Sequence, residues 1–434
     1  MKQVLSVLFL FISVPLWAAS DIQSLKTPSG IQVWLVEDHN IPFVALELRF
    51  KGGASIDPVE KAGATNLMMA LLEEGSGDMT AQDFAAAKER LAASFSYESY
   101  QDAVSISARF LTENRDEAVA LLRQSLLTPN FDIDAVDRVR AQVLTGLKSS
   151  ETDPEDIVGK AFNAEAYGSH PYGRDDSGTK ETVSALSRED LHAAHKYAMV
   201  LDRAYVSAVG DISPEDLSAL VDRLLAGLPQ HSTRDLPQKA ELGLGAGIEV
   251  IDFATPQSVA LFGHVGIARD HPDFFAAYLL NQIFGGGGLE SRLTREIREN
   301  RGLTYGVGTY LVSRDYADVV IGQFASANDR MGEALNVLRS EWANISQNGV
   351  TQEELDRTKT YLTGAYPLRF DGNAPIANIL VGMQMQGLDP SYVTTRNDKV
   401  NAVTLEQINA VAAWLYKPDQ LRIFVVGQPD LRSE

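Results

Sequence analysis

The sequence predicts an α+β protein built from two homologous domains, each a largely antiparallel sheet covered by helices. Three observations lead to this prediction. The chain has 434 residues, more than one compact domain usually holds. Short apolar segments typical of strands alternate with longer segments of helical spacing. The order strands, helices, strands, helices, strand occurs twice, which indicates a duplicated unit of about 200 residues.

The composition fits a soluble globular protein and limits its partners. Hydrophobic residues make up 45% of the chain and charged residues 22%, which excludes disordered and collagen-like classes. The net charge is −20, and an acidic surface disfavours nucleic acids and anionic membranes as partners. There is no cysteine, so neither a lipoprotein anchor nor a disulfide framework is possible.

The N-terminus has the features of a secretory signal peptide. After a positive start at Lys2, an apolar run extends from Val4 to Trp17, and small residues follow it. This run is too short to span a bilayer comfortably. We therefore expect residues 1–20 to be removed on export and the mature protein to be periplasmic, without stable membrane insertion. A retained anchor is the alternative.

The first domain is predicted over residues 21–229. Strand signals are β-branched or aromatic runs bounded by turn residues, such as the Asp38 to Pro42 turn. Helix signals are apolar residues three and four apart, with Asp78 or Thr80 as a cap and Pro154 as a first-turn residue. The strands are predicted at 31–37, 43–51, twice within 94–110 and at 204–210, and the helices at 58–74, 81–92, 113–127, 133–150, 157–167, 188–198 and 214–228.

A polar stretch with proline and glycine, residues 230–246, is predicted to link this domain to a second one over 247–434. Thr404 and Gln407 have the spacing of a capping box before the last helix. The second domain is predicted to have strands at 248–253, 258–265, 303–310, 318–327 and 421–427, and helices at 274–284, 289–301, 330–345, 352–368, 374–386 and 405–415.

The segment 284–310 holds the residues most suited to chemistry. Gly285 to Gly288 predict a flexible loop or a mobile lip, and Gly302 occupies the position of a helix C′ glycine. Arg298 is predicted late in the preceding helix and Tyr305 in the following strand. A guanidinium and a phenol brought together by this turn could hold a peptide carbonyl or stabilise an oxyanion. A solvated arginine and a structural tyrosine are the alternative.

This segment resembles the C-terminal half of the M16 (pitrilysin/insulinase-type) peptidases, especially the bacterial two-domain subunits. The shared features are SRL at 291–293, RGLTY at 301–305, and an Arg and a Tyr with six residues between them. The resemblance extends over nearly the whole chain after about residue 25. It implies two homologous domains that form half of a clam-shell with the LuxS/metallohydrolase-like fold. It also implies that Arg298 and Tyr305 complete a peptidase active site.

The zinc motif of the family is absent. Active subunits carry H-x-x-E-H on a helix, in which two histidines bind zinc and the glutamate acts as general base. The family pattern aligns with 63–76 here and places Asn66 and Ala70 at the histidine positions and Met69 at the base. The downstream ligand position falls near Gly146. None of these four side chains can replace the family's ligands or base, so we expect no metal in this chain.

Other candidate sites are weaker. Glu73 and Glu74 are adjacent on a helix and point in diverging directions, which favours a solvated face. His192 and His195 have i,i+3 spacing but no acidic base between them, which favours a surface or packing role. His170 is predicted to be structural, and the Asp175–Asp176 pair has no motif context. There is no G-x-S-x-G elbow and no cysteine nucleophile, which argues against a self-sufficient hydrolase.

The preferred hypothesis is a non-catalytic subunit of a heterodimeric zinc metallopeptidase, inactive alone. A partner subunit with H-x-x-E-H would bring zinc, and this chain would bring Arg298 and Tyr305 to a peptide substrate. The peptide would add as a strand to a sheet edge, a binding mode that the family resemblance implies. The alternative is a catalytically inert scaffold or peptide-binding protein of the same fold. The sequence leaves the partner, the substrate and a homodimer open.

Overall fold

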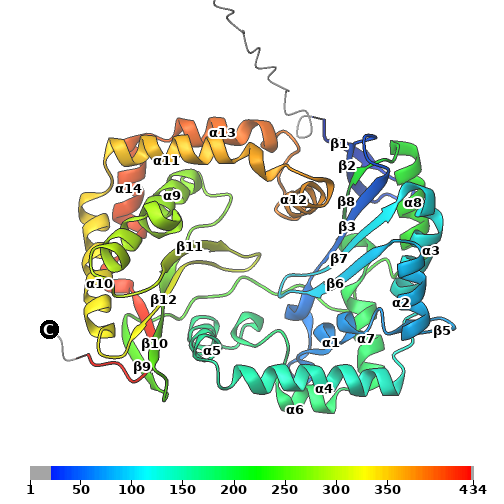
Figure 1. Cartoon of the computed structure of the whole chain (residues 1–434), viewed down its shortest axis with the longest axis horizontal. Coiled ribbons are helices and arrows are strands. Elements are labelled where there is room, and N and C mark those ends of the chain that lie inside the picture. Colours follow the sequence, from blue (N-terminus) through cyan, green and yellow to red (C-terminus); the bar gives the residue numbers. More distant parts are fainter. Residues whose placement is uncertain (1–20, 432–434) are drawn as a thin grey trace, which may run out of the picture.

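The computed structural model describes residues 21–431, so the predicted signal peptide lies outside the described range. Two large β-sheets stand at opposite ends of the molecule, and helices surround both (Figure 1). Each sheet is mostly antiparallel, which confirms the predicted α+β class with two related sheets. Among residues 21–431, the helices are too short or too polar for any of them to cross a bilayer.

The two sheets have the same strand order. The first contains six strands in the order β1 (Gln23–Lys26), β2 (Gln32–Glu37), β8 (Ala204–Gly210), β3 (Phe43–Lys51), β7 (Ala103–Leu111) and β6 (Ser94–Ser99). The second contains β9 (Gly247–Asp252), β13 (Arg422–Gly427), β10 (Gln257–Val265), β12 (Asp318–Ala327) and β11 (Val307–Ser313). The order is the same once β1, which has no counterpart in the second sheet, is left out. In the first sheet β2 pairs in parallel with β8, and in the second sheet β9 pairs in parallel with β13. β6 and β11 are therefore equivalent edge strands.

Amphipathic helices build one apolar core on each sheet. The first sheet carries α1 (Ala64–Ala70), α2 (Ala81–Arg90), α3 (Arg115–Leu127), α7 (Arg188–Ala198) and α8 (Pro214–Leu225). The second carries α9 (Phe274–Asn281), α10 (Met331–Asn348), α11 (Gln352–Ala365) and α14 (Leu405–Leu415). Thr80 with Asp83 and Thr404 with Gln407 form capping boxes at the starts of α2 and α14, and the Thr404 box confirms the sequence prediction.

Each half covers the other sheet with one of its helices. α4 (Ile133–Ser150) leads to α5 (Pro154–Tyr167), whose Phe162 packs against Phe424 of the second sheet. In return α12 (Asn373–Met385) lies on the first sheet, where Leu380 packs with Trp34. Ser207 of β8 donates to the carbonyl of Ala377 at 2.6 Å. The linker therefore separates the two sheets in the sequence, but each sheet packs against a helix from the other half of the chain.

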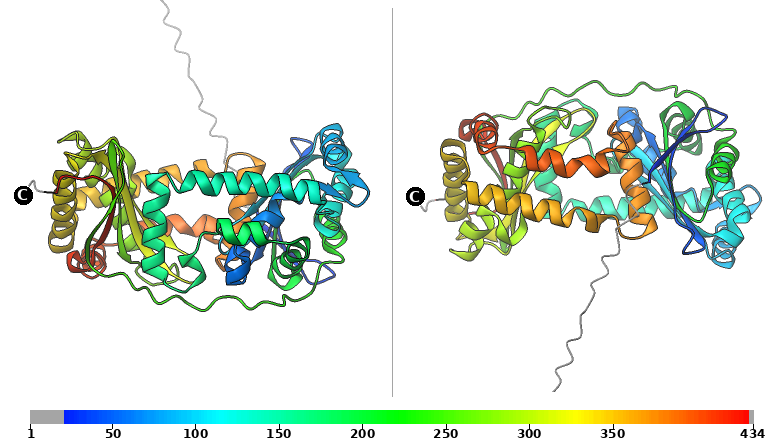
Figure 2. Two further views of the ribbon diagram at one scale, coloured as in Figure 1. Left: turned by 90° about the horizontal axis from the view of Figure 1, so that it is seen from below. Right: turned by 90° about the horizontal axis from the view of Figure 1, so that it is seen from above.

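The predicted linker, residues 230–246, contains neither helix nor strand. Figure 2 shows it as an extended segment that runs along the outside of the molecule from one half to the other. It is held there by backbone hydrogen bonds, including Ala240 N–H to the carbonyl of Tyr316 at 2.8 Å and Gly243 N–H to that of Ala166 at 2.9 Å. These bonds explain how a polar stretch without regular structure stays ordered against the protein.

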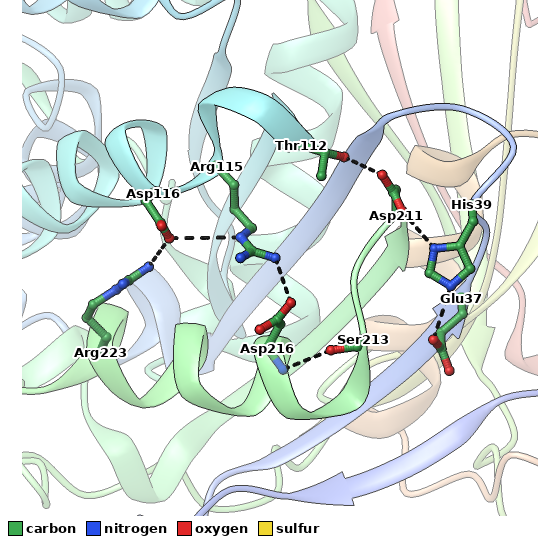
Figure 3. Close-up of polar contacts among 9 residues, drawn as sticks. All are labelled: Glu37, His39, Thr112, Arg115, Asp116, Asp211, Ser213, Asp216 and Arg223. Carbon is green, nitrogen blue, oxygen red and sulfur yellow. Dashed lines mark hydrogen bonds and ion pairs between the residues drawn. The ribbon is translucent and has the colours of Figure 1, made fainter.

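Surface ion pairs connect α3, α8 and the β2–β3 turn in the first half (Figure 3). Arg115 on α3 pairs with Asp216 on α8 at 3.0 Å. Asp211, just after β8, accepts from the Thr112 hydroxyl and pairs with His39 Nδ1 at 2.7 Å. Hydrogen bonds from His39 to Asp211 and to Glu37 raise the pKa of this exposed histidine above its ordinary value.

Several predicted elements differ from the structure. The helix predicted at 58–74 is divided into a 3₁₀ turn (Val59–Lys61) and α1, because Gly63 adopts a left-handed conformation with φ of 90°. A side chain there would collide with the Ser177 carbonyl, so tertiary packing requires a glycine that interrupts the helix. Three further elements, β1, α6 (Lys180–Ala185) and α13 (Tyr392–Ala402), were not predicted, because their apolar patterns are short or irregular.

Candidate functional site

The expected zinc-motif positions lie on α1 and α4, and these two helices contact each other. Met69 is buried in the core, Ala70 is exposed at the end of α1, and Asn66 donates to the Ser177 hydroxyl at 2.8 Å. Gly146 on α4 has open space where a side chain would be. An amide, a thioether, a methyl group and a hydrogen atom do not fit a zinc ion, which needs imidazole or carboxylate ligands.

Nearby acidic residues are engaged elsewhere. Glu73 pairs with Lys88 and Glu74 with Arg138, both at 2.5 Å. The two carboxylates reach different helices, as expected for adjacent residues with diverging side chains. Within residues 21–431 no group of three or more histidine, aspartate or glutamate side chains is placed to hold a metal ion.

Arg298 and Tyr305 lie on either side of a tight turn before β11. The helix predicted at 289–301 is instead a 3₁₀ turn (Gly288–Glu290) followed by a π-helical segment (Thr294–Glu299). Gly302 ends this segment with φ of 59°, and its N–H donates to the Arg298 carbonyl at 2.8 Å, which confirms the predicted C′ glycine. β11 begins only at Val307, so Tyr305 belongs to the turn and not to the predicted strand at 303–310.

The turn that carries Tyr305 is fixed by its neighbours. Thr304 Oγ1 donates to the Ala325 carbonyl at 2.7 Å and accepts from Gly306 N–H at 3.2 Å. Ser326 donates to the Leu303 carbonyl at 2.6 Å. Arg330 donates to the carbonyls of Arg301 and Gly302 at 3.0 and 3.1 Å. The backbone is therefore rigid on both sides of Tyr305, and sequence reasoning did not identify this support.

A buried ion pair anchors the π-helical segment to α11. Arg292 donates two hydrogen bonds to Glu354, at 2.7 and 2.6 Å, and both side chains are nearly buried. Burial disfavours the charged form of Glu354, but hydrogen bonds from Arg292 and from the Thr351 backbone outweigh burial and lower its pKa to about 2. Glu354 also forms the capping box of α11 with Thr351. The T-x-x-E spacing at 351–354 is the signal that could have identified it.

The functional side chains themselves are free. Tyr305 is 90% exposed, Arg298 is exposed, and neither side chain forms a hydrogen bond or ion pair within residues 21–431. No contact joins the two side chains to each other in this range, so their cooperation stays a prediction. Tyr305 borders a hollow of about 450 Å³, which Tyr310 of edge strand β11 and Gln323 of β12 also line. The Tyr305 hydroxyl beside this hollow is therefore available to a ligand.

The glycine run is packed and not the flexible loop or lip that the sequence suggested. Gln282 to Gly286 form a π-helical turn that continues α9. A Cβ on Gly285 would lie 2.4 Å from Thr309 Oγ1, and one on Gly287 would lie 2.6 Å from the Gln282 carbonyl. Glycine is required here for close approach to β11, and only Gly288, with φ of 59°, has open space around it.

The remaining candidates are structural. His195 is buried and bonds the Leu126 carbonyl at 2.7 Å, while the His192 ring packs edge-on against Phe131, which confirms a packing role for this pair. His170 accepts from the N–H of Tyr172 at 3.1 Å, as expected for a structural loop residue. Burial raises the pKa of the Asp176 carboxyl, and the charge of the neighbouring Asp175 raises it further.

Two family models match the chain. Residues 32–180 match the model described as "Insulinase (Peptidase family M16)", and residues 185–362 match "Peptidase M16 inactive domain". A crystal structure of a peptidase M16 inactive domain from Pseudomonas fluorescens superposes with a TM-score of 0.88 at 29% identity, over 95% of this chain and 99% of that one. A protease structure from Helicobacter pylori shares the fold, with a TM-score of 0.84 at 17% identity, over 94% of this chain and 99% of that one.

Curated relatives carry two kinds of name. A protein of Helicobacter pylori called "Non-peptidase homolog YmxG" is 25% identical, over 94% of each chain. The "Uncharacterized zinc protease YmxG" of Bacillus subtilis is 22% identical, over 92% of this chain and 96% of that one. Because both names occur among relatives of full length, the side chains at the motif positions are the better guide to this chain.

Proposed function

The chain belongs to the M16 peptidase family, and we propose that it is the non-catalytic subunit of a two-chain zinc peptidase. A partner subunit with an intact H-x-x-E-H motif would hold the metal and the general base. This chain would bring Arg298 and Tyr305 to the peptide. The observation that carries the proposal is a contrast between two parts of the chain. The positions of the zinc motif hold no metal-binding side chain, whereas the side chains of Arg298 and Tyr305, beside a rigid turn, have no hydrogen-bond partner within residues 21–431.

In this assignment, Tyr305 would donate its phenolic hydrogen to the oxyanion that develops on the scissile carbonyl. A donor that is already in place costs little reorganisation in the transition state, and one such donor typically contributes 10²–10³-fold in rate. Arg298 would bind a carbonyl of the peptide or orient Tyr305. The bonds from Thr304 and Arg330 to the turn supply the rigidity that such positioning needs.

The peptide would bind in an extended form along β11. This strand is an edge of the second sheet and pairs only with β12 within residues 21–431, so one side of its backbone is open to another strand. The hollow beside Tyr305 adjoins this edge. Main-chain hydrogen bonds would then dominate binding over side-chain specificity. The signal-like residues 1–20 suggest that the subunit acts in the periplasm.

An inert scaffold of the same fold is the second candidate, and the name of the Helicobacter pylori relative favours it. The exposure of Tyr305 argues against it, because a scaffold gains nothing from a large aromatic side chain that is 90% exposed. If the chain is a scaffold, removal of both donors should leave every partner-dependent activity unchanged.

The test begins with a native pull-down of the mature chain and mass spectrometry of the eluate. We expect a companion of similar size that carries H-x-x-E-H, and chelator-sensitive peptide cleavage. Tyr305→Phe should then lower kcat about 10²-fold in the reconstituted pair, and Arg298→Ala should lower kcat/KM. Tyr361→Phe and Arg339→Ala, which alter an exposed tyrosine and an exposed arginine on α11 and α10, are the matched controls.

Because both side chains are exposed and unpaired, none of these substitutions should change Tm or complex formation. If the Tyr305→Phe pair cleaves peptides at the rate of the unsubstituted pair, the assignment of the oxyanion donor is wrong. If the chain elutes alone, or with a companion that shows no chelator-sensitive cleavage, the scaffold function replaces the proposed one.

A further inference from the structure

A cavity of about 400 Å³ lies between α12, α9, α13 and the Arg49 side chain of the first sheet, and Tyr305 is not among its lining residues. Four arginines line it: Arg49 from β3, Arg269 from the β10–α9 connection, Arg369 from the turn after α11, and Arg396 from α13. Six of the other twelve lining residues are aromatic. No aspartate or glutamate lines the cavity, although the chain has a net charge of −20.

None of the four arginines forms an ion pair within residues 21–431. Arg396 is only 5% exposed, and its guanidinium donates to neutral acceptors, the Leu362 carbonyl and Asn397 Oδ1, both at 2.9 Å. Arg49 bonds the Asn378 amide oxygen at 2.5 Å, and its Nε is buried without any partner. Arg49 and Arg269 are half-buried and Arg369 is exposed, so the cost of a charge without a counter-charge falls mainly on Arg396, and an anion in the cavity would relieve this cost.

The aromatic wall orients the guanidinium groups. Arg269 lies over the ring of Phe274 at 4.2 Å, and Arg396 lies over that of Tyr366 at 4.6 Å. Arg269 already donates one hydrogen bond to the Tyr392 hydroxyl, at 2.5 Å, and its other N–H groups have no acceptor within residues 21–431. A guanidinium that stacks on a ring through its face directs its N–H edge outward in its own plane. Such an edge matches the two oxygens of a carboxylate. Tyr366 provides no counter-charge, because burial and then the neighbouring Tyr392 raise its pKa to about 12.

From this arrangement we propose that the cavity binds a carboxylate attached to an apolar group, and that its source is the C-terminus of a peptide with an apolar last residue. The arginines would hold the carboxylate. The side chain of the last peptide residue would pack on Met383, Leu388 and the aromatic rings. A free inorganic anion has no apolar group that could use this part of the cavity.

A series of neighbouring hollows extends from this cavity along β11 toward Tyr305. A third hollow of about 320 Å³ shares Arg269, Phe274 and Tyr278 with the arginine cavity and follows β11. It reaches Tyr310, which also lines the hollow beside Tyr305. β11 has seven residues, so at about 3.3 Å per residue an extended peptide of about seven to ten residues would span the distance. The peptide source rests on the proposed function, whereas the carboxylate site itself does not.

The experiment measures binding to the purified mature chain without its partner. The probe is an N-terminally fluorescent decapeptide that ends in phenylalanine with a free carboxylate, followed by polarisation. The same peptide with a C-terminal amide should bind at least about tenfold more weakly. Arg269→Gln with Arg369→Gln should cause a similar loss for the free acid and little change for the amide. Arg339→Gln on α10, which alters an exposed arginine outside the cavity, is the control and should leave binding unchanged.

Equal affinity for the acid and the amide in the unsubstituted chain would overturn the proposal, and this comparison does not depend on the folding of any variant. If 3-phenylpropionate displaces the peptide as strongly as the free decapeptide does, a small carboxylic acid replaces the peptide C-terminus as the ligand. Binding without partner-dependent cleavage would count against the proposed function alone. Partner-dependent cleavage without a preference for the free acid would count against this cavity alone.

Discussion

The two halves of the molecule carry equivalent edge strands, β6 and β11, with very different side chains beside them. Beside β6, helix α1 keeps its buried residues Leu67, Met68 and Met69, but presents no metal ligand. Before β11, Arg298 and Tyr305 project into solvent from a turn held by Thr304 and Arg330. The comparison teaches that packing can preserve a fold after its metal chemistry is lost. Exposed donors can likewise be retained with little effect on stability.

Zinc ligands restored to the first half would test the comparison most strongly. Asn66→His, Ala70→His and Gly146→Glu place two imidazoles four residues apart on α1 and a carboxylate on α4, where an added side chain meets no atom. We expect one zinc ion per chain with a Kd of about 1 μM or tighter, against no saturable binding by the unsubstituted chain. Calorimetric titration with zinc measures this.

The matched control replaces Gly146→Glu with Gly146→Gln, whose neutral amide should weaken zinc binding at least about tenfold. If the triple variant keeps its Tm and binds no zinc, α1 and α4 are not arranged as a metal site. The two halves would then differ in backbone as well as in side chains.

Ion pairs give a second comparison, since Arg292–Glu354 is nearly buried and Arg138–Glu74 is more exposed. Arg292→Met should lower the free energy of unfolding by about 2–4 kcal/mol, because it leaves a carboxylate buried without its partner. Arg138→Met should lower it by less than about 1 kcal/mol. Urea unfolding at pH 7 measures both. Equal losses would mean that the second half is no more firmly anchored than the first.

The same pair predicts a pH dependence. The pKa of Glu354 is about 2 in the folded chain and 4.5 ordinarily. Its stabilising contribution is therefore complete above about pH 4.5 and is lost as the pH falls toward 2. The difference in unfolding free energy between the unsubstituted chain and Arg292→Met should shrink between pH 5 and pH 3. A constant difference would contradict this assignment.

Two glycines give the smallest effects and opposite signs. Gly285→Ala would push a methyl group into Thr309 and should destabilise the chain by about 1–3 kcal/mol. Gly146 lies within helix α4 and has open space around it. Gly146→Ala should therefore stabilise the chain by about 0.5–1 kcal/mol, because alanine favours the helix more than glycine does. Thermal unfolding of both variants measures this. A neutral Gly285→Ala would mean that the glycine run is the mobile loop expected from the sequence.

The sequence by itself determined the features that depend on local pattern or residue identity. Strand alternation and helical spacing predicted most elements, because burial on one face imposes a period on nearby residues. The Thr404 capping box and the Gly302 turn were predictable because their hydrogen bonds join residues a few positions apart. The family resemblance aligned Asn66, Met69, Ala70 and Gly146 with the zinc-motif positions, and the identities of these residues then predicted that the chain holds no zinc.

Tertiary structure alone decided what depends on contacts between distant residues. The exchange of α5 and α12 between the sheets, and the start of β11 after Tyr305, depend on which surfaces meet. The convergence of Arg49, Arg269, Arg369 and Arg396 depends on this packing as well. These arginines lie up to 347 positions apart (396 − 49), and no local pattern relates them. Gly285 was predicted to be flexible because its contact with Thr309 cannot be seen in the sequence. Thr309 leaves no room for a side chain at position 285, but it becomes a neighbour of Gly285 only in the folded chain.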